Sequence, residues 1–428
     1  MRSERPRVLI VGAGFGGLQT AKTLSRTPVE VTIIDRHNYH CFQPLLYQVA
    51  TAALSPADVA WPIRHMLRRQ RNATVFMTEV VGIDAAQREV RTTAGSFRFD
   101  FLVIATGAMH SYFGHDAWAA FAPGLKRIED ATRTRRGILS AFERAELADD
   151  DNLRRQLLTF VIVGGGPTGV EMAGAIAEVA RKTLRRDFRR IDPRNARIVL
   201  IEAGPLLLPS FSARHSAYAR ATLAAMGVEV MTSTRVTCCD QHGVDLDDGR
   251  IDAGCVIWAA GITASPAADW LAAEHDRAGR VIVRPDLSLP RHDDIFVIGD
   301  TASVQESSGR PVPGLAPAAK QMGHHVGRLI AARLTGRAGR ADRMPPPPFH
   351  YRDRGVLATI GRRAAIVELG PIQLRGFVGW LFWSLAHIYF LIGVRNRLVV
   401  AVTWLWSYLT FQRGARLITD VPPPRAQR

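Results

Sequence analysis

The sequence predicts an α/β protein with two similar parallel-sheet domains and a C-terminal helical segment. Three observations predict this organisation. A strand, a glycine-rich turn and a helix are expected at residues 8–24, and the same pattern returns at residues 160–174. Apolar, partly β-branched runs alternate with helical stretches along the chain, as they do in proteins with parallel sheets. From residue 374 onward, the chain becomes strongly apolar and aromatic.

The first pattern reads VLIVGAGFGGLQTAKTL and has the glycine spacing of the Rossmann fingerprint. Gly12 allows the tight turn, Gly14 lets a diphosphate approach bare backbone, and Gly17 lets the helix pack close to its strand. The helix N-terminus would face the phosphates with unpaired N–H groups. A second strand, expected at residues 31–35, ends in Asp35, which would hydrogen-bond the ribose of an adenine dinucleotide.

The second pattern reads FVIVGGGPTGVEMAG, with Gly164, Gly166 and Gly169 in the fingerprint positions. The strand expected at residues 198–202 ends in Glu202. A single glycine pattern is weak evidence, because ordinary turns also use glycine, but chance rarely duplicates strand, glycines, helix and terminal acid together. Two dinucleotide sites in one chain are typical of enzymes in which a flavin and a nicotinamide meet.

The charge balance predicts attraction to anionic surfaces. Lys and Arg number 55 against 39 Asp and Glu, which gives a formal charge of +16. The arginines are dispersed, without a base-reading helix or an aromatic stacking platform, and this argues against nucleic acid as a partner. An anionic lipid surface is favoured because the C-terminus is both apolar and basic. The basic crossover at residues 181–190 is interpreted as a solvated helix face rather than a binding patch.

The cysteines and the N-terminus indicate a reduced, cytoplasmic setting. The four cysteines form neither a CxxC nor a metal-ligand spacing, so we expect buried thiols and no metal site. The few polar residues before the first strand leave no room for a secretory signal.

Two apolar runs near the C-terminus predict a membrane-associated helical hairpin. Residues 377–394 and 398–411 are rich in tryptophan and tyrosine, and arginines follow each run. A run of 18 residues is at the lower edge of what spans a bilayer. The aromatic and arginine content suits helices that lie in the lipid interface. The alternative is a buried hairpin or a homodimer contact.

Further motifs, in their order along the chain, resemble those of the type II NADH:quinone oxidoreductases. The chain carries FQPLLYQVAT, ATGA, WAAGI, VIGD, APAAKQMG and ATIGR, and then RNRLVV and RGARLIT near its end. The resemblance covers nearly the whole length. It implies two Rossmann-like domains, an FAD-binding domain (residues 1–120 and 286–345) with an inserted NAD-binding domain (residues 121–285). A C-terminal hairpin with amphipathic membrane-anchoring helices would occupy residues 346–428.

The resemblance also implies the residues of the sites. FAD would be bound by Gly12, Gly14, Gly17, Asp35, Thr106 and Asp300, and NADH by Gly164, Gly166, Gly169 and Glu202. Glu171 matches a family acid near the stacked rings. Two glutamines four residues apart approach the flavin from the quinone side in the family. Gln321 matches one of them, whereas Pro317 stands where the other would be and removes a hydrogen-bond donor.

The function implied by the resemblance is FAD-dependent oxidation of NADH with two-electron transfer to a membrane quinone. The protein would be peripheral or monotopic at the cytoplasmic face of the cell membrane. No cluster of ionisable residues lies within credible transmembrane helices, so nothing in the sequence predicts proton pumping. The alternatives are a related NAD(P)H-dependent reductase that uses a cysteine pair and a flavin-retaining redox sensor with a non-quinone acceptor. The former needs a dithiol near the flavin, and only Cys41 lies in the first flavin segment.

Overall fold

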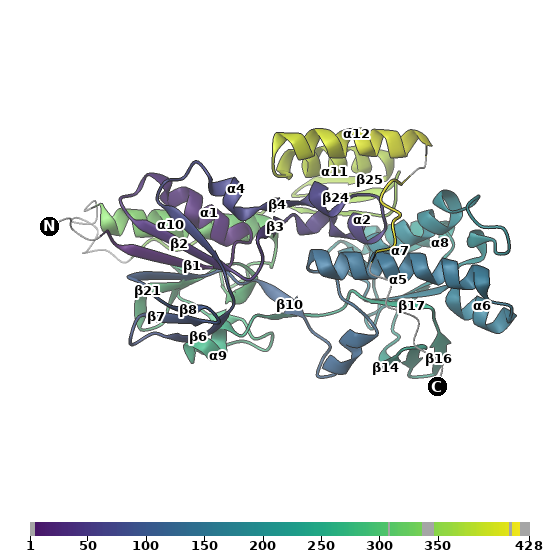
Figure 1. Cartoon of the computed structure of the whole chain (residues 1–428), viewed down its shortest axis with the longest axis horizontal. Coiled ribbons are helices and arrows are strands. Elements are labelled where there is room, and N and C mark those ends of the chain that lie inside the picture. Colours follow the sequence, from purple (N-terminus) through teal and green to yellow (C-terminus); the bar gives the residue numbers. More distant parts are fainter. Residues whose placement is uncertain (1–4, 307–308, 336–345, 411–412, 420–428) are drawn as a thin grey trace. The chain divides into compact units, whose positions relative to one another are not determined.

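The computed structural model divides into two compact units (Figure 1). The structure describes residues 5–306, 309–335, 346–410 and 413–419. Unit 1 consists of Met1–His40, Trp61–Met109 and Ile262–Arg354, and unit 2 of Cys41–Ala60, His110–Gly261 and Gly355–Arg428. The chain thus passes from unit 1 to unit 2 three times and returns to unit 1 twice. The expected domain boundaries stay a prediction.

Unit 1 is built on a six-stranded sheet with β1 near its centre. The order is β20 (Ser288–Leu289), β21 (His292–Val297), β9 (Phe101–Ile104), β1 (Arg7–Val11), β2 (Glu30–Asp35) and β5 (Ala73–Met77). Strands β21, β9, β1, β2 and β5 run parallel. Phe76 and Met77 of the edge strand β5 are exposed, whereas nearly all apolar residues of the other four strands are buried. Burial on both faces explains why these strands read as continuous apolar runs.

Two helices of unit 1, α1 (Phe15–Thr23) and α10 (Ala316–Leu334), pack against each other at short range. A Cβ atom at Gly323 would lie only 2.2 Å from the carbonyl oxygen of Gly16. The hydroxyl of Thr20 donates to the Gly323 carbonyl at 3.1 Å. The APAAKQMG motif therefore ends in the glycine that brings α10 against the first fingerprint helix.

Unit 1 has several further regular elements: α4 (Ile63–Leu67), β6 (Val80–Asp84), β7 (Glu89–Thr92), β8 (Gly95–Arg98), β18 (Ile262–Ala264), α9 (Ala267–Leu271), β19 (Val281–Ile282) and β22 (Ala302–Ser303). Three short strands lie where the chain passes between the units: β3 (Tyr39–Cys41), β4 (Ala60–Pro62) and β10 (Ala108–His110).

Unit 2 repeats the parallel arrangement on a smaller scale. Its four-stranded sheet has the order β13 (Val228–Met231), β12 (Arg197–Ile201), β11 (Thr159–Val163) and β17 (Cys255–Trp258). The helices of this part are α5 (Ile128–Leu147), α6 (Asp151–Leu157), α7 (Pro167–Glu178) and α8 (Ala213–Ala225), and an antiparallel sheet is formed by β14 (Val236–Asp240), β15 (Gly243–Leu246) and β16 (Gly249–Asp252). The α/β class predicted from the sequence is confirmed.

The C-terminal region contributes a small sheet and a helical hairpin to unit 2. Strands β23 (Val356–Thr359), β24 (Ala365–Leu369) and β25 (Ile372–Arg375) are antiparallel, and helices α11 (Gly376–Phe390) and α12 (Val394–Thr410) follow (Figure 1). Trp383 and Val400 are buried on the inner face of the hairpin. Large apolar side chains are exposed elsewhere on it: Phe377, Val378, Leu381, Phe382, Leu385, Tyr389, Phe390, Val394, Leu398, Val402, Leu405, Trp406 and Leu409. Within the described residues, neither of these helices nor any other is long and apolar enough to cross a membrane.

Polar contacts fix the hairpin to the segment that carries FQPLLYQVAT. The Trp404 indole N–H donates to Gln48 Oε1 at 2.7 Å. The Asn396 amide donates to the carbonyl oxygens of Ala57 (3.1 Å) and Asp58 (3.2 Å), in α3 (Pro56–Val59). One face of the hairpin therefore packs against the rest of unit 2, and the other face is an exposed apolar surface.

The segment after α12 is held by a buried ion pair. Arg413 Nη2 lies 3.0 Å from Glu178 Oε2 at the end of α7, and Arg413 Nη1 donates to the Thr51 carbonyl at 2.7 Å. The other Glu178 oxygen accepts from the Arg362 backbone N–H at 2.6 Å. Burial raises the pKa of Glu178, and the two arginines oppose this effect. Removal of one partner of such a pair leaves an uncompensated buried charge.

Candidate functional site

The first fingerprint forms a tight turn between β1 and α1. Gly12 has φ +99°, and its N–H donates to the Ile34 carbonyl at 2.8 Å. A Cβ atom at Gly17 would lie 1.9 Å from the Gly12 oxygen, so a larger residue cannot fit there. Asp35, at the end of β2, accepts a hydrogen bond from the Ala13 N–H at 2.7 Å. The acid is thus held against the turn at the N-terminus of the helix.

The second fingerprint forms the same turn in unit 2. Gly164 has φ +111°, and its N–H donates to the Ile201 carbonyl at 2.7 Å. A Cβ atom at Gly169 would lie 1.8 Å from the Gly164 oxygen. Glu202 follows β12 and accepts from the N–H groups of Gly165 and Gly204, each at 2.6 Å. The two turns therefore match in their strained glycine, their close helix contact and their anchored acid.

Both turns fit the diphosphate of a dinucleotide. Gly14 and Gly166 cap helices α1 and α7. A Cβ atom at Gly166 would meet no atom within 4 Å, and one at Gly14 would meet only the Ala105 oxygen at 4.0 Å. The backbone is thus open where a phosphate would approach, and the helix N-terminus supplies N–H groups and partial positive charge.

Thr106 and Asp300 lie beside the first turn in the sheet of unit 1. The β9 residue Ile104 pairs with Val11 of β1 and with Val297 of β21, so the chain segments after these three strands emerge at one sheet edge. Thr106 Oγ1 lies 2.5 Å from Ser265 Oγ and 3.3 Å from Thr301 Oγ1. Gly12, Thr106 and Asp300 therefore come together where ligands bind in open α/β sheets.

Gln321 lies in α10, which begins at Ala316 and has Pro317 in its first turn. Its Oε1 accepts from the Arg352 N–H at 2.9 Å, and its Nε2 donates to the Arg352 carbonyl at 3.0 Å. Both ends of the amide are thus bonded to the backbone at Arg352. The resemblance implies a place for Gln321 on the quinone side of the flavin, and the structure shows its amide paired with this backbone.

Glu171 lies in unit 2, two residues after Gly169, and lines a cavity. Aromatic and polar side chains surround the cavity, including Tyr47, Gln48, Trp380, Trp383, Ser384, Trp404 and Tyr408. Glu171 Oε1 accepts from the Thr359 N–H at 3.4 Å. Burial raises the pKa of Glu171 to about 8, so the carboxyl group holds a proton near neutral pH.

Sequence reasoning did not assign individual residues of this cavity besides Glu171. The phenol oxygen of Tyr47 accepts from Gln48 Nε2 at 2.9 Å. Trp383 Nε1 and Ser384 Oγ are buried without a hydrogen-bond partner in the described part of the chain. The available signal was Tyr47 and Gln48 within the largely apolar FQPLLYQVAT, but only the tertiary contact with α11 and α12 makes them cavity residues.

Comparisons with known proteins agree with this geometry. Residues 6–323 match a family model described as pyridine nucleotide-disulphide oxidoreductase. The type II NADH:quinone oxidoreductase Ndh of Mycobacterium tuberculosis is 44% identical over an alignment of 430 positions, which covers 97% of this chain and 91% of that protein. The chain belongs to the type II NADH:quinone oxidoreductases.

More distant relatives show how widely the fold is shared. The type II NADH:quinone oxidoreductase of Staphylococcus haemolyticus is 31% identical over 84% of this chain and 89% of its own length. The structure of NDH2 from Plasmodium falciparum in complex with NADH has a TM-score of 0.86 at 20% identity, over 95% of this chain and 98% of that chain. The family recognised from the sequence motifs is confirmed.

The thiols of this type II oxidoreductase do not favour the cysteine-pair alternative. All four cysteines are free. Burial raises the pKa values of Cys41, Cys239 and Cys255 to about 12, so these three thiols stay protonated near neutral pH. Because the thiolate is the nucleophile in disulfide chemistry, they are poor candidates for an electron relay.

The second turn gives a matched pair of glycine substitutions. Gly169→Ala should destabilise the fold by about 3 kcal/mol or more, because its Cβ would overlap the Gly164 oxygen. Gly166→Ala should leave the melting temperature nearly unchanged, since Gly166 has φ −70° and open space around its Cβ position. It should nevertheless weaken NADH binding by about tenfold or more, because the methyl group stands where the diphosphate approaches. Thermal melts and NADH titration measure the two effects; equal melting temperatures for both variants would contradict the close-packing argument.

The raised pKa of Glu171 predicts a specific pH dependence of stability. Between its usual pKa of 4.5 and about 8, the folded protein holds a proton that the unfolded chain releases. Stability should therefore fall as pH rises through this window, and level off above it. Glu171→Gln should match the wild type near pH 4.5 and exceed it by a few kcal/mol near pH 8. Thermal melts of the FAD-loaded proteins test this, with Glu143→Gln on the exposed face of α5 as control. Parallel pH profiles for wild type and Glu171→Gln would contradict it.

Proposed function

We propose that this chain oxidises NADH by means of bound FAD and reduces a membrane quinone, without proton pumping. The observation that carries the proposal is the duplicated turn, in which each unit has a strained glycine, an open helix N-terminus and an anchored acid. Bound FAD would supply the chemistry of hydride acceptance from NADH and of two-electron transfer to the quinone. The 44% identity to a type II NADH:quinone oxidoreductase over nearly the full length supports the same reaction.

The turn in unit 1 is proposed to bind FAD, and the turn in unit 2 to bind NADH. Gly12, Gly14, Gly17, Asp35, Thr106 and Asp300 would hold the former, and Gly164, Gly166, Gly169 and Glu202 the latter. The Glu202 carboxylate would accept from the ribose 2′-hydroxyl of NADH and repel the 2′-phosphate of NADPH. No arginine follows Glu202 closely, the next being Arg214, so a counter-charge for that phosphate is lacking nearby in sequence.

The cavity beside Glu171 is proposed to admit the quinone head group. Its aromatic walls suit a flat apolar ring, and Trp383 Nε1 and Ser384 Oγ, which belong to its lining residues, are buried without a hydrogen-bond partner among the residues that the structure describes. Glu171 would hold a proton at its carboxyl oxygen beside the ring, which supports a role in the proton uptake that accompanies quinone reduction. Gln321 is proposed to act indirectly, by positioning the Arg352 segment against α10.

The exposed face of the α11 and α12 hairpin is proposed to lie in the lipid interface at the cytoplasmic side of the cell membrane. Its large apolar side chains need a partner, and Arg395 and Arg397 near the start of α12 would meet anionic headgroups. The inner face of the same hairpin lines the proposed quinone cavity through Trp383 and Trp404. A quinone dissolved in the bilayer would thus be taken up by a protein that lies on its surface.

Quinone-dependent oxidation of NADH tests the proposed reaction. The purified, FAD-loaded protein should oxidise NADH rapidly only when a short-chain quinone is present. The kcat/KM for NADH should exceed that for NADPH by about tenfold or more, because Glu202 favours a free 2′-hydroxyl. Glu202→Gln keeps the size of the side chain but removes its charge, and it should lower this preference by about tenfold.

The same assay separates the alternatives. Slow turnover with every quinone tested would favour the redox sensor. Comparable efficiency with both nicotinamides would contradict the assignment of Glu202. Asp248→Asn, which removes an exposed acid between β15 and β16, is the charge control and should leave the preference unchanged.

Vesicle binding tests the proposed membrane face. A Leu405→Glu/Leu409→Glu variant should lose more than about tenfold of its binding to vesicles of anionic phospholipid, since each side chain is more than half exposed on α12. Turnover with a water-soluble quinone should persist. Val81→Glu, at an exposed apolar position in unit 1, is the control. Unchanged vesicle binding, together with conversion of a dimer to a monomer in light scattering, would instead identify the face as a homodimer contact.

A further inference from the structure

Unit 2 contains a second cavity that the proposed reaction does not use. It has a volume of about 290 Å³, near the lower end of the range for small-molecule sites. One wall is a face of α5, and the others are the segment around Pro123, the turn between β14 and β15, and the start of β17. Its lining, here named the α5 cavity, is Phe121, Pro123, Arg133, Thr134, Arg136, Gly137, Ser140, Asp240, Gln241, Ala253, Gly254, Cys255 and Val256.

Two arginines of one helix line the α5 cavity. Arg133 and Arg136 are three residues apart on the helix and so lie on one face, with Ser140 one turn further along. The only acid among these lining residues, Asp240, is paired with Arg250. Its two oxygens accept from Arg250 Nη2 at 2.8 and 2.9 Å, and Oδ1 also accepts from the His242 N–H at 2.7 Å.

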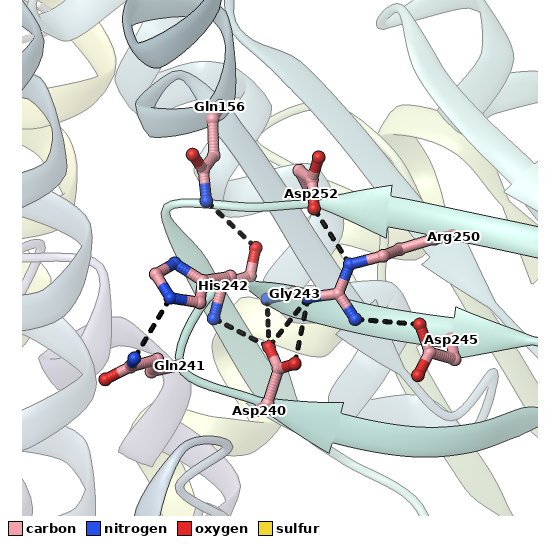
Figure 2. A network of polar contacts seen from close by, with 8 residues as sticks. All are labelled: Gln156, Asp240, Gln241, His242, Gly243, Asp245, Arg250 and Asp252. Carbon is pink, nitrogen blue, oxygen red and sulfur yellow. Dashed lines mark hydrogen bonds and ion pairs between the residues drawn. The ribbon is translucent and has the colours of Figure 1, made fainter.

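The wall that contains Asp240 is rigidly held. Figure 2 shows Arg250 between three carboxylates, with Nη1 2.7 Å from Asp245 and Nε 2.9 Å from Asp252. Gln156 of α6 donates to the His242 carbonyl at 3.1 Å and so ties the turn to a helix. The arginines of α5 therefore lie in a cavity with a fixed wall, in which Asp240 is already paired with Arg250.

Thr134 and Gly137 are the buried polar residue and the small residue that α5 contributes to the cavity lining. Thr134 is buried, and its hydroxyl has no hydrogen-bond partner in the described part of the chain, although a helical threonine commonly bonds the carbonyl one turn back. A buried hydroxyl without a partner costs free energy that a ligand can recover. Gly137 lets β17 approach, because a Cβ atom there would already lie 3.4 Å from Cys255 Sγ. Burial raises the pKa of Cys255 to about 12, so this thiol is an inert part of the wall.

We propose that the α5 cavity binds a small phosphorylated metabolite, with Arg133 and Arg136 on its phosphate groups. Guanidinium groups match phosphate oxygens in geometry and charge, and pairs of them are typical of phosphate sites. Thr134 and Ser140 supply hydroxyl groups at the same wall. Phe121, Pro123 and Val256 supply apolar surface for the rest of the ligand. This site is built from residues other than those of either fingerprint turn.

Calorimetric titration with inorganic pyrophosphate tests the proposal. The full chain is used with FAD bound and NAD⁺ at saturation, so that both dinucleotide turns are already filled. The wild type should bind one pyrophosphate, and Arg133→Gln/Arg136→Gln should weaken binding by about tenfold to hundredfold. Arg144→Gln, in the exposed last turn of the same helix, removes one charge outside the cavity and should leave binding unchanged.

Thr134→Val provides a second measurement that does not depend on charge. It keeps the shape of the side chain and removes the unpartnered hydroxyl, so the free protein should melt at the same temperature or higher, while pyrophosphate binds several-fold more weakly. This combination separates a ligand contact from a loss of folding. No binding by the wild type, or equal binding by the wild type and the double arginine variant, would overturn the proposal.

Discussion

The hydrogen bond between a strand-end carboxylate and a glycine-turn N–H is the constraint on which both units depend. Asp35 makes it to Ala13, and Glu202 makes it to Gly165. This hydrogen bond fixes the glycine turn relative to the second strand. The position of the turn then determines where the following helix begins. A charge-assisted bond of this kind is stronger than a neutral one, so the acid shapes the site before any ligand arrives. A residue that the sequence assigns to ligand recognition is therefore also part of the scaffold.

The C-terminal hairpin combines two roles that a hydropathy pattern cannot separate. Trp383 and Val400 are buried in unit 2, whereas Leu405 and Leu409 are exposed. A surface helix normally shows polar residues on its outer face, and here both faces are apolar. This explains why the sequence left anchor and core as alternatives. The inner face is core, and the outer face still needs an apolar partner.

The fold and the two turns were predictable from the sequence because their signals are local. Glycines at fixed spacing, with a strand before and an acid after, specify a backbone conformation within about thirty residues. The cavity beside Glu171 was not predictable in the same way, because Gln48 and Trp404 meet across 356 positions of sequence. Gln321 shows the opposite difficulty. Its motif was visible, but only tertiary structure reveals that its amide is paired with the backbone of Arg352.

The ion pair between Glu178 and Arg413 has a consequence for how the chain folds during synthesis. The two residues are separated by 235 positions, and the Arg413 side chain is among the last described groups of the chain. Domains commonly fold as units as they emerge from the ribosome, but the buried acid of unit 2 gains this cation only after 235 further residues have been made. Both helices of the apolar hairpin precede Arg413 and are therefore synthesised before the ion pair can form. The core of unit 2 is thus completed only after its exposed apolar face has been made.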